Sequence, residues 1–141
     1  MSNQRNIIVI GGGAAGMIAA IAAAKEGCAV SLYEKNEKLG KKIFITGKGR
    51  CNVTNAGDMD ELFAAVITNK KFMFSSFYGF TNEDMMQFLE DAGLRLKTER
   101  GKRVFPLSDH SSDVIAALER TLKKENVKVY LRKEVKGLNF I

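Results

Sequence analysis

The chain has 141 residues, of which 45% are apolar and 27% charged, and its 22 Lys and Arg against 16 Asp and Glu give a net charge of +6. This composition is typical of one globular domain and excludes a low-complexity or repeat protein. No apolar run is long enough to cross a bilayer and residues 1–6 are polar, so we expect a cytoplasmic protein with no membrane partner. Cys28 and Cys51 form no C-x-x-C pair beside the single His, so no metal site is expected.

Residues 6–34 are predicted to form a strand–turn–helix–strand unit. Ile7–Ile10 is a continuous apolar run, typical of a parallel strand that is buried on both faces. An Ala-rich helix is predicted over Ala14–Glu26, with Gly27 at its end. Ala29–Tyr33 is the second predicted strand. This order of elements predicts an α/β fold with a parallel sheet.

The turn between the first strand and the helix matches the pattern G-x-G-x-x-G, with the residues Gly11-Gly12-Gly13-Ala14-Ala15-Gly16. Gly11 permits the tight turn, Gly13 lets the backbone approach a pyrophosphate, and Gly16 allows the helix and strand to pack closely. The start of the helix, at the two alanines, offers free N–H groups and a positive dipole end to phosphates. The turn therefore predicts a Rossmann-like βαβ unit that binds FAD or NAD(P).

Glu34 follows the second predicted strand. Its carboxylate can accept hydrogen bonds from ribose hydroxyls and would repel a 2′-phosphate, which argues against NADP at this site. The alternative is a purely structural turn with a surface Glu. Strand, turn, helix and acid together favour the dinucleotide site over this alternative.

Residues 35–57 form a long, basic, Gly-containing connection, predicted to be a functional loop near the flavin. A flavin needs groups that hold the second phosphate, the ribityl chain and the ring, and this loop favours FAD over NAD because it supplies them. Cys51 either lies near the flavin or is a buried thiol without reactivity, and the second interpretation is favoured. The candidate cofactor-binding residues are Lys35, Lys41, Lys42, Thr46, Gly47, Gly49, Arg50, Cys51 and Asn52.

Residues 58–110 are predicted to form a helical and hairpin excursion from the sheet. The elements, in chain order, are a helix over Asp58–Thr68, an aromatic segment over Lys71–Phe80, a capped helix from Thr81 to Gly93, and a hairpin of Leu94–Thr98 with Arg103–Phe105. The aromatic segment is expected to pack onto the core, and the lining of a substrate pocket is the alternative.

Residues 111–135 are predicted to form a second helix and strand, and a further strand follows. The elements are a helix from a cap at Ser111 or Ser112 through Glu125, a strand of alternating Val127, Val129 and Leu131, and an apolar strand of Leu138, Phe140 and Ile141. No cap or polar tail closes that last strand. We therefore expect residues 1–141 to be the N-terminal part of a larger protein, with a truncated domain.

Residues 40–55 are similar to the signature G-K-K-x-x-x-T-G-x-G-R-C-N-x-T-N of the BaiN/YhiN-like flavoproteins, a family of NAD(P)/FAD-dependent oxidoreductases. Residues 103–108 resemble a second stretch of that family, R-V-F-P-x-S. The resemblance implies a glutathione-reductase-like FAD domain, in which the strand near residues 127–132 returns to the parallel sheet. It also implies that the backbone of Val135 pairs with adenine.

The leading hypothesis is the FAD-binding portion of a flavin-dependent oxidoreductase, with NAD(P)H as a possible electron donor and the substrate site outside these residues. The alternatives are an NAD-binding dehydrogenase domain and a non-enzymatic nucleotide-binding module. No nucleic-acid partner is expected, because charge alone is weak evidence. His110 is expected to be a surface or capping residue. Catalytic residues, substrate and oligomeric state stay open, and this part alone is expected to be inactive.

Overall fold

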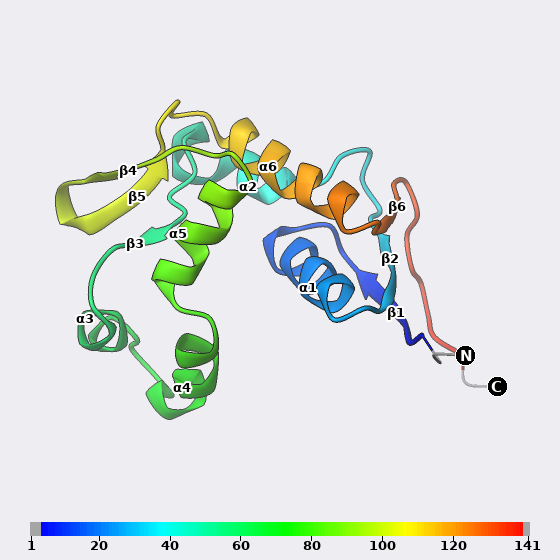
Figure 1. Ribbon diagram of the computed structural model, residues 1–141, viewed down its shortest axis with the longest axis horizontal. Helices are drawn as coiled ribbons and strands as arrows, with labels where there is room; N and C mark the ends of the chain where they lie inside the picture. Colours follow the sequence, from blue (N-terminus) through cyan, green and yellow to red (C-terminus); the bar gives the residue numbers. More distant parts are fainter. Residues whose placement is uncertain (1–3, 140–141) are drawn as a thin grey trace.

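The structure is a computed structural model that describes residues 4–139. A parallel sheet of three strands, on the right of Figure 1, has the order β1-β2-β6. Its strands are β1 (Asn6–Ile10), β2 (Ala29–Tyr33) and β6 (Lys128–Tyr130). The predicted α/β class with a parallel sheet is confirmed, and β6 joins the sheet beside β2 as the family resemblance implies.

Two helices, α1 (Ala14–Lys25) and α6 (Ser111–Lys124), provide much of the apolar core around this sheet. The core side of the sheet carries Val30 and Leu32, which are buried. Ile8 and Ile10 alternate with the inward residues of β1 and are 64% and 54% exposed. The prediction that β1 is buried on both faces is therefore wrong. Residues 4–139 cover only one face of this strand.

A second, antiparallel sheet lies on the left of Figure 1 in the order β3-β5-β4. Its strands are β3 (Thr54–Asn55), β4 (Leu96–Glu99) and β5 (Arg103–Pro106). The predicted hairpin of β4 and β5 is confirmed, and it turns through the short 3-10 segment η2 (Arg100–Lys102). Gly101 has φ +76° in that turn, a conformation that favours glycine.

Residues 35–57, predicted as one long loop, contain three short elements instead. They are α2 (Lys41–Ile45), the 3-10 segment η1 (Thr46–Gly49) and β3. β3 pairs with β5, whose residues lie far along the chain. The sequence did not reveal this strand because two residues show no periodicity and the pairing is entirely non-local.

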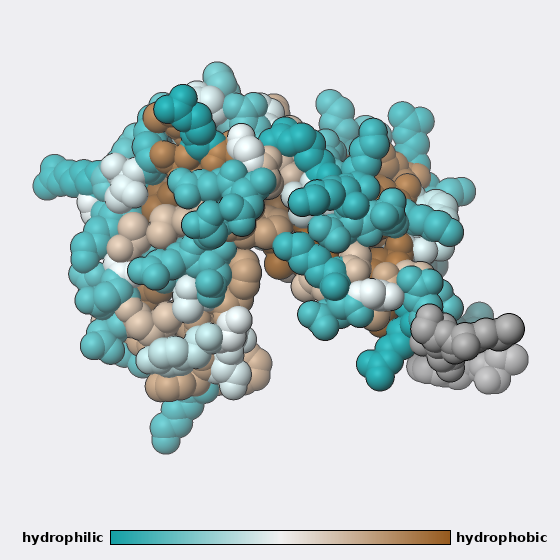
Figure 2. Space-filling model, viewed as in Figure 1, coloured by the Kyte–Doolittle hydropathy of each residue, from teal (hydrophilic) through white to brown (hydrophobic). Residues whose placement is uncertain are grey.

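The aromatic segment does not pack onto the core as predicted. It forms the helix α4 (Lys70–Gly79), none of whose residues is buried, beside the short helix α3 (Met59–Ala64). Phe63 of α3 stacks on Phe74 at 4.8 Å and lies 5.1 Å from Phe77, ring centroid to centroid. The aromatic rings therefore pack mainly on one another, and apolar groups reach the surface over α4 at the lower left of Figure 2.

α5 (Asn82–Asp91) begins with the predicted cap, because Thr81 and Asp84 form a reciprocal capping box. The predicted cap of α6 is wrong. His110 is the N-cap residue without a side-chain capping bond, and the Ser111 hydroxyl instead donates to the carbonyl oxygen of Phe44 at 3.0 Å. Within the described part of the chain, no helix combines the length and apolarity that a membrane span requires.

The last predicted strand is not formed where the structure describes it. Leu138 lies outside any strand and is 68% exposed. Phe140 and Ile141 lie outside the described residues.

Close packing at Gly16 predicts that a side chain at this position destabilises the fold. A Cβ at this position would lie 1.8 Å from the carbonyl oxygen of Gly11, so Gly16→Ala forces the turn and helix apart. We expect the free energy of unfolding to fall by about 1–3 kcal/mol or more in a urea titration. Gly79→Ala is the matched control, since no atom lies within 4 Å of its Cβ. Equal midpoints for the two variants would contradict this packing.

Candidate dinucleotide-binding site

The glycine-rich turn connects β1 to α1 and is hydrogen-bonded to the end of β2. Gly11 has φ +100°, and its N–H donates to the carbonyl oxygen of Tyr33 at 2.8 Å. The N–H of Gly12 donates to Oε2 of Glu34 at 2.6 Å. Gly12 was not predicted to be a site residue, but a Cβ there would lie 2.2 Å from Cδ2 of the buried Leu39, so a side chain at this position would displace Leu39. The turn is thus closed on the side that faces Glu34 and Leu39.

The turn is open at Gly13. A Cβ at Gly13 would meet no atom within 4 Å, and Ala14 and Ala15 are exposed at the start of α1. Among the described residues, no acceptor is found for the N–H groups of Ala14, Ala15 and Gly16. The positive end of the twelve-residue helix α1 therefore points its free donors into open space, where a phosphate oxygen can accept them.

Glu34 is 7% exposed and both of its carboxylate oxygens are engaged. Oε2 accepts from Gly12, while Oε1 accepts from the backbone N–H of Asn36 at 2.8 Å and from its side-chain amide at 2.6 Å. Burial by itself raises the pKa of Glu34, but the hydrogen bonds from Asn36 and Gly12 outweigh it, so the pKa lies below its usual value. A carboxylate has about four lone-pair sites, which leaves Oε2 one acceptor position for a hydroxyl.

The chain after β6 returns to the end of β2. The N–H of Lys133 donates to the carbonyl oxygen of Glu34 at 2.9 Å, and the N–H of Arg132 donates to that of Asn36 at 2.9 Å. Val135 follows two residues later and is half-buried. Its proposed pairing with adenine stays a prediction, and the structure places the preceding residues of its segment against Glu34.

Several residues of the signature segment, residues 46–55 after α2, adopt left-handed backbone conformations. Gly47, Lys48, Gly49 and Cys51 all have φ between 56° and 85°. The hydroxyl of Thr46 donates to the carbonyl oxygen of Ile43 at 2.8 Å, so this side chain already has an acceptor. The segment is a tight, folded turn rather than an extended loop.

Arg50, a candidate cofactor ligand by sequence, is engaged with the antiparallel sheet. Its guanidinium donates to Oδ1 of Asp109 at 2.8 and 2.5 Å and to Oε1 of Glu99 at 2.5 Å. Lys97 donates to Oδ2 of the same Asp109 at 2.6 Å. The guanidinium also lies 4.2 Å from the ring centroid of Phe105. These contacts form what we call the Arg50 network, which comprises Arg50, Lys97, Glu99 and Asp109.

The two asparagines of the signature also make structural contacts. With its amide oriented to satisfy both groups, Asn52 donates to the carbonyl oxygens of Val104 and Thr54 at 3.1 and 3.0 Å. Asn55 donates to the carbonyl oxygen of Gly101 at 2.8 Å. Each contact ties the signature segment to β3 or to the β4–β5 hairpin.

Cys51 is 7% exposed and belongs to the core. Burial raises the pKa of its thiol, and a hydrogen bond with Thr46 offsets only part of that effect. A thiol that stays protonated is a poor nucleophile, so Cys51 has the properties of a packing residue.

The lysines of residues 35–42 remain at the surface. Lys35 and Lys42 are exposed, and Lys35 lies close enough to Glu34 to lower its pKa slightly. Lys41 reaches back to Oδ1 of Asn36 at 3.4 Å and pairs with Glu37 at 3.3 Å. These positive charges lie near the turn because the N–H of Gly40 donates to the carbonyl oxygen of Gly12.

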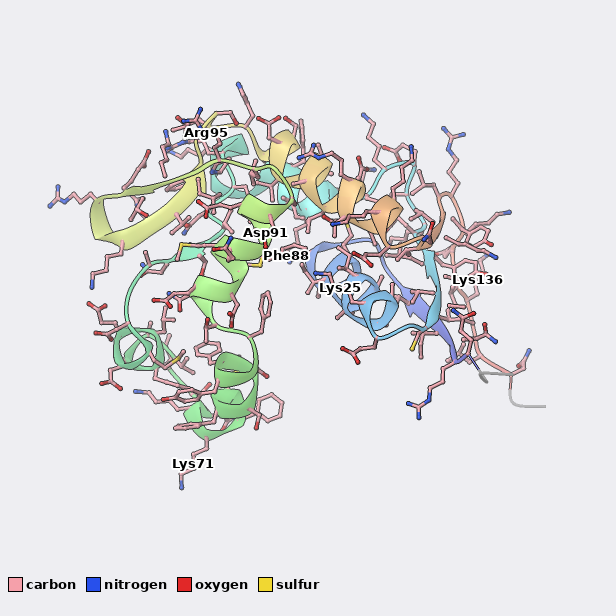
Figure 3. All side chains as sticks on the ribbon, in the orientation of Figure 1. Lys25, Lys71, Phe88, Asp91, Arg95 and Lys136 are labelled. Atoms are coloured by element: carbon pink, nitrogen blue, oxygen red, sulfur yellow. The ribbon has the colours of Figure 1, made fainter. Side chains whose placement is uncertain are left out.

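A separate hollow of about 600 Å³ is lined mainly by α5 and α6, with Lys25 of α1 at its edge, and Figure 2 shows the surface indented between α5 and α1. Figure 3 shows Lys25 of α1 approaching Phe88 of α5, with the Lys25 Nζ 5.4 Å from the ring centroid. Lys25 lies at the C-terminal end of α1, the end opposite the glycine-rich turn. The hollow is therefore distinct from the candidate site.

An open glycine-rich turn at the start of a helix and a buried acid at the end of the next strand are typical of a Rossmann-type domain. The family model described as the HI0933-like protein Rossmann domain matches residues 5–140. The chain belongs to this family, which confirms the family resemblance drawn from the signature.

Two curated relatives are enzymes. The chain is 37% identical over 137 residues to a 3-dehydro-bile acid Δ(4,6)-reductase of Clostridium scindens, covering 96% of this chain and 33% of the relative. It is 33% identical over 128 residues to a ribosomal RNA dihydrouridine synthase of Escherichia coli, covering 91% of this chain and 31% of the relative. The chain thus spans about a third of the length of these relatives.

A solved structure shares the fold. The 3-ketosteroid-Δ4-(5α)-dehydrogenase of Rhodococcus jostii superimposes with a TM-score of 0.53 at 15% identity, over 94% of this chain and 39% of that one. At this identity the likeness concerns the fold.

Glu34 predicts a specific pH dependence of stability. Its pKa is lower in the folded state, so its contribution is present above the usual value of about 4.5 and is lost as the pH falls through the lower folded-state pKa. We expect Glu34→Gln to cost roughly 1–3 kcal/mol of unfolding free energy at pH 7. Urea titrations from pH 7 to pH 3 should show this difference shrinking below about pH 4.5. A constant difference would contradict the assignment.

The raised pKa and burial of Cys51 predict a slow reaction with iodoacetamide in the native protein. The partly exposed Cys28 is the internal comparison, and mass spectrometry separates the two sites. We expect Cys28 to be modified first and Cys51 only after urea is added. In a Cys28→Ser variant, rapid native labelling of Cys51 would show that the thiol is accessible and reactive.

Proposed function

We propose that this chain is the FAD-binding portion of a flavin-dependent oxidoreductase. The observation that carries the proposal is the open space at Gly13, beside the free N–H groups at the start of α1. The buried carboxylate of Glu34 is hydrogen-bonded to the same turn. This arrangement suits a pyrophosphate and a ribose in one ligand.

The residues present fit the ADP half of FAD. The backbone at Gly13, Ala14 and Ala15 would hold the pyrophosphate, because nothing fills the space that a Cβ at Gly13 would occupy. Glu34 would accept from a ribose hydroxyl through the free position on Oε2. Its negative charge disfavours a 2′-phosphate at the same place, which argues against NADP as the resident ligand.

The groups for the flavin half come from residues 41–52. Lys41 and Lys42 place positive charge beside the turn without occupying it. Gly47 and Gly49 bring backbone close to the surface. When bound, the flavin would accept and donate a hydride, and the chain's own residues would bind and orient it.

We extend to the whole protein only the chemistry that its two relatives share. A Δ(4,6)-reductase and a dihydrouridine synthase both saturate a carbon–carbon double bond in their named substrates. We therefore propose reduction of such a bond, with NAD(P)H as the electron donor. The substrate site is proposed to lie outside these residues.

Gly13→Val tests the FAD site. The valine side chain would occupy the space that a pyrophosphate needs, while no protein atom lies within 4 Å of the new Cβ. We expect FAD binding to be abolished with the fold retained, as judged by the visible spectrum of the purified protein and by circular dichroism. Gly79→Val, distant from the turn, is the matched control.

A competition titration separates FAD from NAD. The proposal predicts that FAD binds and that NAD fails to displace it. A colourless wild-type protein that gains no flavin absorbance on adding FAD would overturn the proposal. Tight binding of NAD alone would favour the NAD-dependent dehydrogenase.

A further inference from the structure

The Arg50 network lies between the signature segment and the antiparallel sheet. Asp109 is its centre, because Oδ1 accepts from Arg50 and Oδ2 accepts from Lys97. Glu99 on β4 accepts a further hydrogen bond from Arg50 and lies 3.4 Å from Lys97. Two positive and two negative side chains therefore neutralise one another, and the charge of Arg50 is already balanced by protein groups.

This network differs from an isolated surface ion pair. Its four side chains are 27–40% exposed, so they are screened less than fully exposed groups. The Arg50 guanidinium packs over the ring of Phe105, which fixes its plane. The hydrogen bonds that Arg50 donates to Glu99 and Asp109 raise the pKa of Arg50, and those that Asp109 accepts from Lys97 and Arg50 lower the pKa of Asp109.

Residues 46–52, which include Arg50, have an unfavourable backbone conformation. Lys48 and Cys51 carry side chains at φ +56° and +60°, a conformation that L-residues adopt rarely. Gly47 and Gly49, on either side of Lys48, also have positive φ, which glycine adopts freely. Such conformations persist where surrounding contacts hold them. Arg50 provides the charged side-chain contacts from this segment to the β4–β5 hairpin and to the turn after it.

We propose that Asp109 and Glu99 are positioning residues for the flavin-binding segment. They hold Arg50 in place, and Arg50 in turn holds the backbone of residues 46–52 in the conformation that binds the cofactor. Arg50 then acts as an anchor and does not contact a phosphate. This inference rests on the proposed function, and it also gives a role to the second family stretch, because Phe105 within residues 103–108 packs against the Arg50 guanidinium.

The test uses the whole protein and two ligands. ADP occupies only the part of the site made by the turn and Glu34, whereas FAD also needs residues 46–52. We expect Asp109→Asn to weaken FAD binding about tenfold in a fluorescence titration and to leave ADP affinity unchanged. The vibrational structure of the bound flavin's visible band should also be lost, and Asp109→Glu should restore part of the affinity.

Two further variants serve as support and control. Glu99→Gln removes the other acceptor of Arg50 and should shift FAD affinity in the same direction. Glu61→Gln breaks the ion pair with Lys102, which joins α3 to the tip of the same hairpin without touching residues 46–52, and it should change neither ligand.

The outcomes separate the inference from the proposed function. If the wild-type protein binds no FAD, the proposed function fails and this inference fails with it. If the wild type binds FAD and Asp109→Asn binds it equally well, the positioning role is overturned while the FAD site stands. An equal loss of ADP and FAD by both Asp109→Asn and Glu99→Gln would also overturn it, since the network would then support only folding.

Discussion

The hydrogen bond from the Gly12 N–H to the Glu34 carboxylate is the constraint on which the rest of the site depends. It joins the end of β2 to the turn after β1, and the absence of a side chain at Gly12 makes that approach possible. The carbonyl of Gly12 accepts from Gly40, which places the start of α2 against the same turn. One glycine residue therefore aligns the turn, Glu34 and the basic segment, while the space at Gly13 stays free.

The two sheets have different roles around this centre. The parallel sheet carries the turn and Glu34, whereas the antiparallel sheet holds residues 46–55 through side chains of the signature. Helix α6 packs against α1, α2 and α5 and so connects the two halves. Ser111, its first residue, donates to the carbonyl oxygen of Phe44 near the end of α2. A rigid link of this kind is what a ligand that spans both halves requires, because its two ends must be held in register.

The parts of the fold that the sequence predicted well are those that local chemistry determines. Gly13 is the N-cap of α1 and Gly27 follows its C-cap at Glu26, and the capping box of Thr81 begins α5, each signal lying within a few residues of sequence. β3 was missed because its two residues become a strand only by pairing with β5. The packing of α4 was predicted wrongly because aromatic content indicates burial but does not name the partner, and Phe63 on α3 takes that role.

At the signature, the residue types and the contacts in the structure suggest different roles for the same side chains, and the cofactor contacts of this segment stay a prediction. Arg50 and Asn52 have the donors that a phosphate or flavin needs, so their residue types alone favour cofactor contacts. In the structure, Arg50 donates to Asp109 and Glu99, and Asn52 donates to the carbonyl oxygens of Val104 and Thr54. All of these partners except Thr54 lie some fifty residues away in sequence. A motif can therefore identify a family while its side chains serve mainly to shape the backbone. In such a site the cofactor meets peptide groups and glycines, and the charged residues decide where those groups lie.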